Sequence, residues 1–333
     1  MENSFYHTDD LSNHSFLVTG GAGFIGSNLT EYLLKNGAGK VRVLDNFLTG
    51  TKHNIKDFFD YTSFELIEGD IRDLDTCKKA CTDIEYVMHQ AALGSVPRSI
   101  KDPINTNSIN INGFLNVITA CKESRIKRFI YAASSSTYGD STALPKTEDT
   151  IGKPLSPYAV SKYVNELYAN VFANLYGLDV IGLRYFNVYG PNQSPEGAYA
   201  AVIPLFIDAV MNDIQPVIYG DGSQTRDFTF VQDAIQANIK AAFVQNSEAI
   251  NSIYNIAAGE QTSVNQLFQI IKDKSGSVLE PTHKDQRIGD IHDSLASIDK
   301  AKRLLNFSPN YDINNGIEKT YDWFLENSKV PSN

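Results

Sequence analysis

The chain has 333 residues, of which 42% are hydrophobic and 20% charged, and its formal net charge is −10 at pH 7. This length suggests roughly two domains and is ample for a buried core, so global disorder is excluded. The acidic balance argues against a nucleic-acid partner, because phosphates are repelled unless a local basic stripe attracts them. The dense basic stretch at residues 122–128 includes Glu123 and is interpreted as a solvated helix end.

Strands and helices alternate in the first half of the chain. Short apolar runs predict strands at residues 16–19, 41–44, 64–67, 86–89, 128–132 and 180–183. Helical periodicity predicts the intervening helices at residues 28–36, 73–81, 103–124 and 157–176. Such alternation implies parallel strands with right-handed crossovers, so we expect an α/β fold with a Rossmann-type doubly wound parallel sheet.

The second half loses this alternation and predicts a smaller, mixed α/β C-terminal part. Prolines and a glycine-rich loop near residues 220–223 mark the change. Helices are expected near residues 202–212, 233–246, 263–274 and 312–328, and a late strand at residues 253–258 is expected to rejoin the sheet. This part should cap the carboxyl edge of the sheet, where open α/β sheets bind ligands.

The three cysteines and the N-terminus predict the compartment. Cys77, Cys81 and Cys121 are sparse and odd in number, which argues against a disulfide framework and for a reducing compartment. Cys77 and Cys81 are interpreted as buried packing rather than a metal site, since no His or further Cys stands at ligand spacing. Residues 1–15 lack the apolar stretch of a signal peptide, and no run approaches the ~18 apolar residues of a membrane span. We therefore expect a cytoplasmic protein with no metal and no membrane partner.

A glycine-rich turn follows the first predicted strand and opens a helix. In the run from Gly20 to Gly26, Gly20 allows the tight turn, Gly23 lets the backbone approach a diphosphate, and Gly26 lets helix and strand pack closely. The helix N-terminus then supplies N–H donors to the phosphates. The turn predicts a dinucleotide site that includes Phe24 and Ile25.

Residues at the ends of the next strands indicate which dinucleotide binds. Asp45 stands 19 residues after Gly26, where its carboxylate can accept hydrogen bonds from the adenosine ribose and would repel a 2′-phosphate, so NAD is favoured over NADP. Asp70 is placed to meet the adenine, although an N-cap for the following helix is an equal alternative. The predicted cofactor residues in this region are Asp45, Asn46, Asp70, Ile71, Gln90, Ala91 and Ala92.

A tyrosine and a lysine share one face of the second long helix. Tyr158 and Lys162 are four residues apart, and the cluster Ser134, Ser135, Ser136 ends the fifth predicted strand at the same sheet edge. A phenol with a pKa of ~10 becomes a base near neutral pH only if nearby cations stabilise its anion. Lys162 and an oxidised nicotinamide would be two such cations, and Ser134 would hold the substrate hydroxyl. The alternative for the serines is a cap of the neighbouring loop.

Four motifs together resemble the extended short-chain dehydrogenase/reductase family: T-G-G-A-G-F-I-G at residues 19–26, the serine cluster before Thr137-Tyr138-Gly139, S-P-Y-A-V-S-K at 156–162, and L-R-Y-F-N-V-Y-G-P at 183–191. Three further segments, at residues 94–100, 132–140 and 197–204, are similar to UDP-N-acetylglucosamine 4-epimerases of bacterial surface-polysaccharide biosynthesis. The resemblance implies a reversible reaction in which Tyr158 deprotonates the sugar 4-hydroxyl while C4 passes a hydride to NAD. The 4-keto sugar then rotates to present its other face, and the hydride returns to C4 on that face.

The resemblance also implies a domain division and a set of substrate residues. It assigns residues 1–187 to an NAD-binding domain, to which about 227–259 returns, and residues 188–333 to UDP-sugar binding. Tyr185 would lie against the nicotinamide, and Asn187 would meet a phosphate. The remaining positions carried over are Gly94, Ser95 and Ser294 near the sugar, Ala201 and Val202 near the uracil, Arg226 and Arg287 at the diphosphate, and Asp290 as a further substrate-binding residue.

Several alternatives stay open at this point. A 4,6-dehydratase would carry Asp-Glu where this chain has Ser135 and Ser136, and a decarboxylase would need a carboxylate-binding arrangement that is not visible. The epimerase could instead act on a UDP-N-acetylhexosaminuronic acid. A non-catalytic NAD-binding protein would tend to lose the Tyr158–Lys162 pair. The two long helices carry apolar residues on more than one face, so we expect a homodimer joined through a four-helix bundle.

Overall fold

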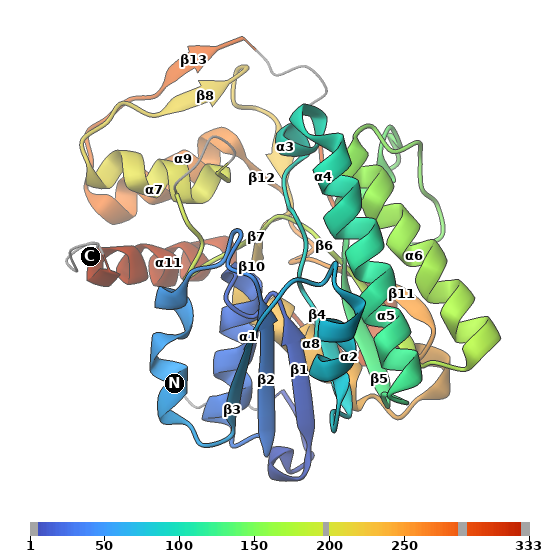
Figure 1. The fold of residues 1–333 in the computed structure, drawn as a ribbon. Helices are drawn as coiled ribbons and strands as arrows, with labels where there is room; N and C mark the ends of the chain where they lie inside the picture. The colour runs from blue at the N-terminus through green and yellow to red at the C-terminus, as the bar shows by residue number, and fades with distance from the viewer. Residues whose placement is uncertain (1–5, 196–199, 286–291, 328–333) are drawn as a thin grey trace.

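The computed structural model describes residues 6–195, 200–285 and 292–327. Seven strands form one parallel sheet in the order β11-β6-β5-β4-β1-β2-β3, which is the predicted doubly wound arrangement (Figure 1). The strands are β1 (Ser15–Thr19), β2 (Lys40–Asp45), β3 (Phe64–Glu68), β4 (Tyr86–His89), β5 (Arg128–Ser134), β6 (Val180–Tyr185) and β11 (Ser252–Ile256). The late strand predicted at residues 253–258 thus pairs with β6 at the sheet edge.

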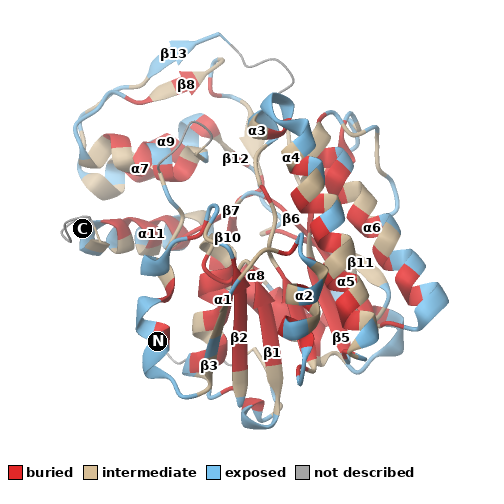
Figure 2. Cartoon of the chain, viewed as in Figure 1, coloured by how far each residue is buried: buried red, intermediate tan, exposed pale blue. Residues whose placement is uncertain are grey.

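Successive strand residues face two separate apolar cores, because side chains alternate across a sheet. Phe16 and Val18 of β1 belong to one core, while Leu17 between them belongs to the other. One core lies under α1 (Phe24–Lys35) and α8 (Val231–Phe243), and the other under α2 (Leu74–Cys81), α5 (Phe114–Glu123) and α6 (Pro157–Tyr176). Figure 2 shows the strands buried between these layers. The three cysteines lie in the second core as free thiols, so the predicted buried packing is confirmed.

The C-terminal part stands beyond the carboxyl edge of the sheet (Figure 1). It contains α7 (Val202–Met211), α9 (Val264–Ser275) and α11 (Ile313–Asn327), whereas α10 (Asp299–Leu305) packs against α8 and β11 of the sheet. Three two-stranded sheets join them: β7 (Val188–Tyr189) with β10 (Thr229–Phe230), β9 (Thr225–Arg226) with β12 (Thr262–Ser263), and β8 (Val217–Tyr219) with β13 (Thr282–Lys284). In the described part of the chain, no helix combines the length and apolarity that crossing a bilayer requires.

The long helix predicted at residues 103–124 is interrupted. It consists of α4 (Pro103–Asn107), a π-helical stretch (Ser108–Gly113) and α5. Asn110, inside this stretch, accepts two hydrogen bonds from outside it. The Asn165 amide donates to the Asn110 backbone carbonyl at 2.7 Å, and the backbone N–H of Leu93 donates to the Asn110 side-chain oxygen at 2.7 Å. Only the first of these bonds gives a partner to a backbone carbonyl of the π-helical stretch, and periodicity alone does not reveal it. A short helix that we did not predict, α3 (Val96–Lys101), precedes it behind the N-cap Ser95.

Candidate active site

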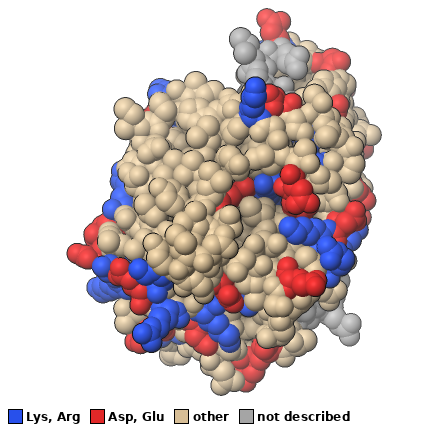
Figure 3. All heavy atoms as spheres, turned by 90° about the vertical axis from the view of Figure 1, so that its right-hand side faces the viewer, with Lys and Arg blue, Asp and Glu red and all other residues tan. Residues whose placement is uncertain are grey.

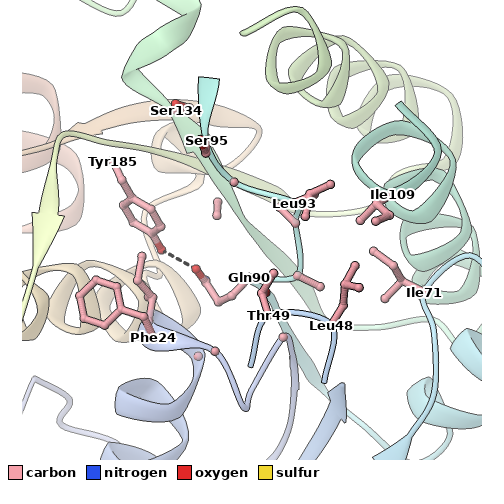
Figure 4. A pocket seen from close by; sticks show the side chains of 18 of the residues that line it. Phe24, Leu48, Thr49, Ile71, Gln90, Leu93, Ser95, Ile109, Ser134 and Tyr185 are labelled. Carbon is pink, nitrogen blue, oxygen red and sulfur yellow. Dashed lines mark hydrogen bonds between the residues drawn. The ribbon is translucent and has the colours of Figure 1, made fainter. Parts of the chain in front are cut away.

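A cleft of about 510 Å³ opens at the carboxyl ends of β1, β2, β4, β5 and β6 (Figure 4). Every predicted cofactor residue lines it, although they come from six separate segments of the chain. They are Gly20, Gly23, Phe24, Ile25, Gly26, Asp45, Asn46, Asp70, Ile71, Gln90, Ala91, Ala92, Tyr158, Lys162 and Tyr185. Of the predicted substrate residues, Gly94, Ser95, Ser134, Ser135 and Asn187 line the same cleft. Ser136 does not line it, but its hydroxyl lies 2.8 Å from that of Ser134.

The glycine turn has the geometry of a diphosphate cradle. A Cβ on Gly26 would lie 2.1 Å from the carbonyl oxygen of Gly20, and a Cβ on Gly20 would lie 2.7 Å from the backbone nitrogen of Ala91. Both positions therefore exclude side chains for reasons of packing. A Cβ on Gly23, the N-cap of α1, would meet only the Gly20 oxygen, at 3.2 Å, and would otherwise project into free space. That space before a helix N-terminus suits an anionic group, so the turn fits the diphosphate of NAD.

The carboxylate of Asp45 anchors the turn and faces the cleft. Its two oxygens accept hydrogen bonds from the backbone N–H of Ala22 at 2.9 Å and of Phe47 at 2.8 Å. Burial raises the pKa of Asp45, while these bonds lower it. Each carboxylate oxygen has a further lone pair, so the group can still accept bonds from ribose hydroxyls and oppose a 2′-phosphate.

Asp70 does not cap the following helix. Asp73 takes that position, because its side chain accepts from the backbone N–H of Asp75. Asp70 instead binds the Arg72 guanidinium at 2.6 Å and the Asn46 amide at 2.8 Å, and the Arg72 hydrogen bond lowers the pKa of Asp70 to about 2. The N-cap alternative is thus wrong, and Asp70 stays ionised at this end of the cleft.

Tyr158, Lys162 and Ser134 all line the cleft, and the Tyr158 phenol lies within hydrogen-bond reach of the Ser134 hydroxyl. Burial raises the pKa of Tyr158, and a hydrogen bond with Ser134 opposes that shift. Lys162 donates to the carbonyl of Ala132 at 2.8 Å, and burial lowers the pKa of Lys162 to about 8. The protein groups alone therefore do not lower the pKa of Tyr158 as we expected. The reason is that the desolvation of the phenol outweighs the help from its polar neighbours.

A buried ion pair lies one helical turn beyond Lys162. The guanidinium of Arg184 forms a bidentate pair with the carboxylate of Glu166, with both bonds at 2.9 Å. Both side chains are almost completely buried, at 3% and 4% exposure. The negative charge of Glu166 raises the pKa of Lys162 against the effect of burial. The pair therefore helps Lys162 to keep its proton near neutral pH.

A second cleft of about 550 Å³ joins the first through Asn187 and Val188 and is formed mainly by the C-terminal part. Ala201, Val202 and Arg226 line it. Arg226 donates to the carbonyls of Thr225 at 2.8 Å and His292 at 3.1 Å. Ser294 lines neither cleft, and Arg287 and Asp290 lie outside the described residues.

Several residues that line the first cleft were not predicted from the sequence. Leu48, Thr49, Leu93 and Ile109 line the first cleft, and Figure 4 shows their side chains around it. Leu48 and Thr49 follow Asp45 closely in the sequence, so they could have been predicted from their position after that carboxylate. Ile109 could not, because it belongs to the unpredicted π-helical stretch. Among the described residues, no group of three or more His, Cys, Asp or Glu side chains could hold a metal ion.

Comparisons with known proteins agree with this geometry. The sequence profile described as the NAD dependent epimerase/dehydratase family matches residues 16–257. A putative UDP-glucose 4-epimerase of Methanocaldococcus jannaschii is 39% identical over 316 residues, which are 94% of this chain and 99% of that protein.

Two solved structures are also similar over most of the chain. UDP-N-acetylglucosamine 4-epimerase from Methanobrevibacter ruminantium, in complex with UDP-N-acetylmuramic acid, is 39% identical with a TM-score of 0.89, covering 94% of this chain and 99% of that one. UDP-glucuronic acid 4-epimerase from Bacillus cereus, in complex with UDP-glucuronic acid and NAD, is 33% identical with a TM-score of 0.87, at 94% and 99% coverage. The predicted resemblance and the predicted NAD cofactor are confirmed. The chain therefore belongs to the NAD-dependent epimerase/dehydratase family.

Proposed function

We propose that the protein is a 4-epimerase that interconverts UDP-N-acetylglucosamine and UDP-N-acetylgalactosamine. The observation that carries this proposal is that Tyr158, Lys162 and Ser134 line the same cleft as the glycine turn, with Tyr158 hydrogen-bonded to Ser134. The described similar proteins act on UDP-sugars at C4, which supports this reaction class.

The chain's own residues divide the work at the sugar 4-hydroxyl. Tyr158 removes its proton and later returns it, and Ser134 holds the hydroxyl by a hydrogen bond. Lys162 stabilises the Tyr158 phenolate by its charge, which at ~4 Å contributes about 4 kcal/mol at an effective dielectric of ~20. NAD, when bound, supplies the hydride acceptor and donor, so the reaction needs no external oxidant. The second cleft, lined by Arg226, would hold the UDP portion.

The charged groups of the first cleft argue against a dehydratase or a decarboxylase. Among its described lining residues, the carboxylates are Asp45 and Asp70, both at the adenosine end, and the cation is Lys162. A dehydratase needs an acid near the sugar C6 hydroxyl, and the serines at 135 and 136 cannot serve as one. A substrate carboxylate would need a cation besides Lys162. The same reasoning favours an uncharged hexosamine over its uronic acid.

The sugar end of the cleft has space for an N-acetyl group. A Cβ on Gly94 would meet no atom within 4 Å, so the cleft is open at this position. Ser95 follows as the N-cap of α3, with a φ of 94°. This open region, in the same cleft as Ser134, supports the choice of an N-acetylated sugar.

Replacing Tyr158 by Phe tests the proposal. We expect a loss of about 10³-fold or more in kcat on UDP-N-acetylglucosamine, measured without added NAD, while binding of the UDP-sugar survives. Tyr163 is a suitable control: it lies on the same helix but lines a separate cavity, so Tyr163→Phe should keep activity. Near-normal turnover by Tyr158→Phe would reject the mechanism. Parallel assays with UDP-glucose and UDP-N-acetylglucosaminuronic acid determine which sugar is the preferred substrate. A wild-type protein that converts none of the three UDP-sugars would indicate a non-catalytic NAD-binding protein instead.

We also propose that two copies pair through α6 and its neighbours. The outer face of α6 exposes Val160, Leu167, Val171 and Leu175, the last at 70%. Figure 3 shows that this side of the molecule carries a wide area without charged side chains. Burying such a face in a four-helix bundle between two copies would remove its apolar surface from water.

A further inference from the structure

Three polar side chains from separate elements form a closed ring of hydrogen bonds at the floor of the first cleft. Tyr185, which ends β6, donates its hydroxyl to the side-chain oxygen of Gln90 at 3.2 Å. The Gln90 amide donates to the side-chain oxygen of Asn238 at 3.1 Å, and the Asn238 amide donates to the Tyr185 hydroxyl at 2.7 Å. The ring thus joins the end of β4, the end of β6 and the middle of α8.

The direction of these bonds follows from one anchor. The Asn238 amide nitrogen also donates to the carbonyl of Ala234 at 2.8 Å, which fixes the amide nitrogen on that side. The Asn238 oxygen must then accept from Gln90, and the Gln90 oxygen must accept from Tyr185. Burial raises the pKa of Tyr185 to about 12, so the phenol keeps the proton that it donates. The three groups therefore hold one another in a single arrangement.

The ring has one buried member and two members at the cleft surface. Asn238 has 0% exposure and does not line the cleft, whereas Gln90 and Tyr185 do. Figure 4 shows Tyr185 and Gln90 pointing toward one another, with Tyr185 on the side of Ser134 and away from Ile71. Among the described residues, none accepts the second hydrogen on the Gln90 amide, so that donor is available to a ligand carbonyl.

The place of the ring in the cleft identifies the ligand group it serves. The adenosine end is marked by Asp45 and Asp70, and the glycine turn stands where a diphosphate fits. The nicotinamide half of a bound NAD would then extend toward Tyr158, past Gln90 and Tyr185. We propose that Asn238 is a positioning residue for the nicotinamide half of NAD. It acts at a distance by fixing the Tyr185 ring and the Gln90 amide, the two groups that this half meets.

Comparing NAD with ADP-ribose, which lacks the nicotinamide, tests this role by calorimetry on protein freed of bound dinucleotide. Asn238→Leu keeps the approximate volume but removes both the donor and the acceptor of the ring. We expect NAD binding to weaken by about tenfold or more, while ADP-ribose binding changes by less than about twofold. Tyr185→Phe removes a different hydrogen bond of the ring without altering the buried helix. It should likewise weaken NAD binding while leaving ADP-ribose binding nearly unchanged.

Gln236→Leu is the matched control. Gln236 is also a buried amide on α8, but its side chain exchanges two hydrogen bonds with the Ser308 backbone, each at 2.8 Å. Its loss should leave the ratio of NAD to ADP-ribose affinity unchanged. Equal weakening of both ligands, or no change in either, in the Asn238 and Tyr185 variants would overturn the proposal. If Asn238→Leu does not fold, the smaller change Asn238→Ser, which also removes the amide that bonds to Tyr185 and Gln90, decides in its place. No sugar is present, so the result is independent of the proposed epimerase activity.

Discussion

The buried pair between Arg184 and Glu166 provides a sharp test of how this fold tolerates charge. Replacing Arg184 by Met would leave the Glu166 carboxylate, at 4% exposure, without the two charge-assisted hydrogen bonds that it now accepts. Removing one partner of a buried pair costs about 3–5 kcal/mol, because the remaining charge stays desolvated. Arg184 also donates to the Tyr138 hydroxyl and to the Glu148 carbonyl, both at 3.0 Å, so the upper part of this range is expected.

Urea denaturation of four proteins measures this cost: the wild type, Arg184→Met, Glu166→Leu and the double variant. We expect each single change to lower the free energy of unfolding by about 3–5 kcal/mol, and the double change to cost much less than their sum. The exposed pair of Lys35 and Glu31, at 62% and 40% exposure, is the control. Its removal should cost less than about 1 kcal/mol. Single changes at the buried pair that cost no more than this control would refute the reasoning.

Four further outcomes follow from the geometry of the site. Lys162→Met should stabilise the protein most below pH 8, by about 3 kcal/mol, since burial lowers the pKa of Lys162 from 10.5 to about 8. Between those two pKa values the unfolded lysine still binds a proton that the folded lysine has lost. The wild type therefore gains stability as pH rises, and the difference in free energy of unfolding between the variant and the wild type becomes smaller. If urea titrations at pH 7, 9 and 10.5 gave the same difference in free energy of unfolding between the two proteins, the expected pH dependence would be contradicted. Gly26→Ala should abolish NAD binding in calorimetry, because its Cβ would lie 2.1 Å from the Gly20 oxygen. Asp45→Asn should weaken NAD binding and narrow the preference over NADP, and unchanged discrimination would argue against its ribose role. Leu175→Lys should convert a dimer to a monomer in sedimentation experiments, whereas a wild-type monomer would remove the proposed bundle.

The sequence alone was sufficient for the features that depend on local pattern. The alternation of apolar strands with amphipathic helices predicts the doubly wound sheet, since each period reports how a segment buries its apolar side. The spacing from Gly20 to Gly26 and the position of Asp45 predict a dinucleotide site, and these residues line one cleft in the structure. This is possible because the carboxyl ends of parallel strands meet at one sheet edge.

Only the tertiary structure decided which groups touch and how burial changes their chemistry. The ring of Gln90, Tyr185 and Asn238 joins residues far apart in the sequence, and no local pattern links them. The pKa values of Tyr158 and Lys162 depend on desolvation, which the number and type of neighbours determine only after the chain has folded. Residue type and spacing thus specify the fold and the place of the site, whereas packing in three dimensions specifies its electrostatics.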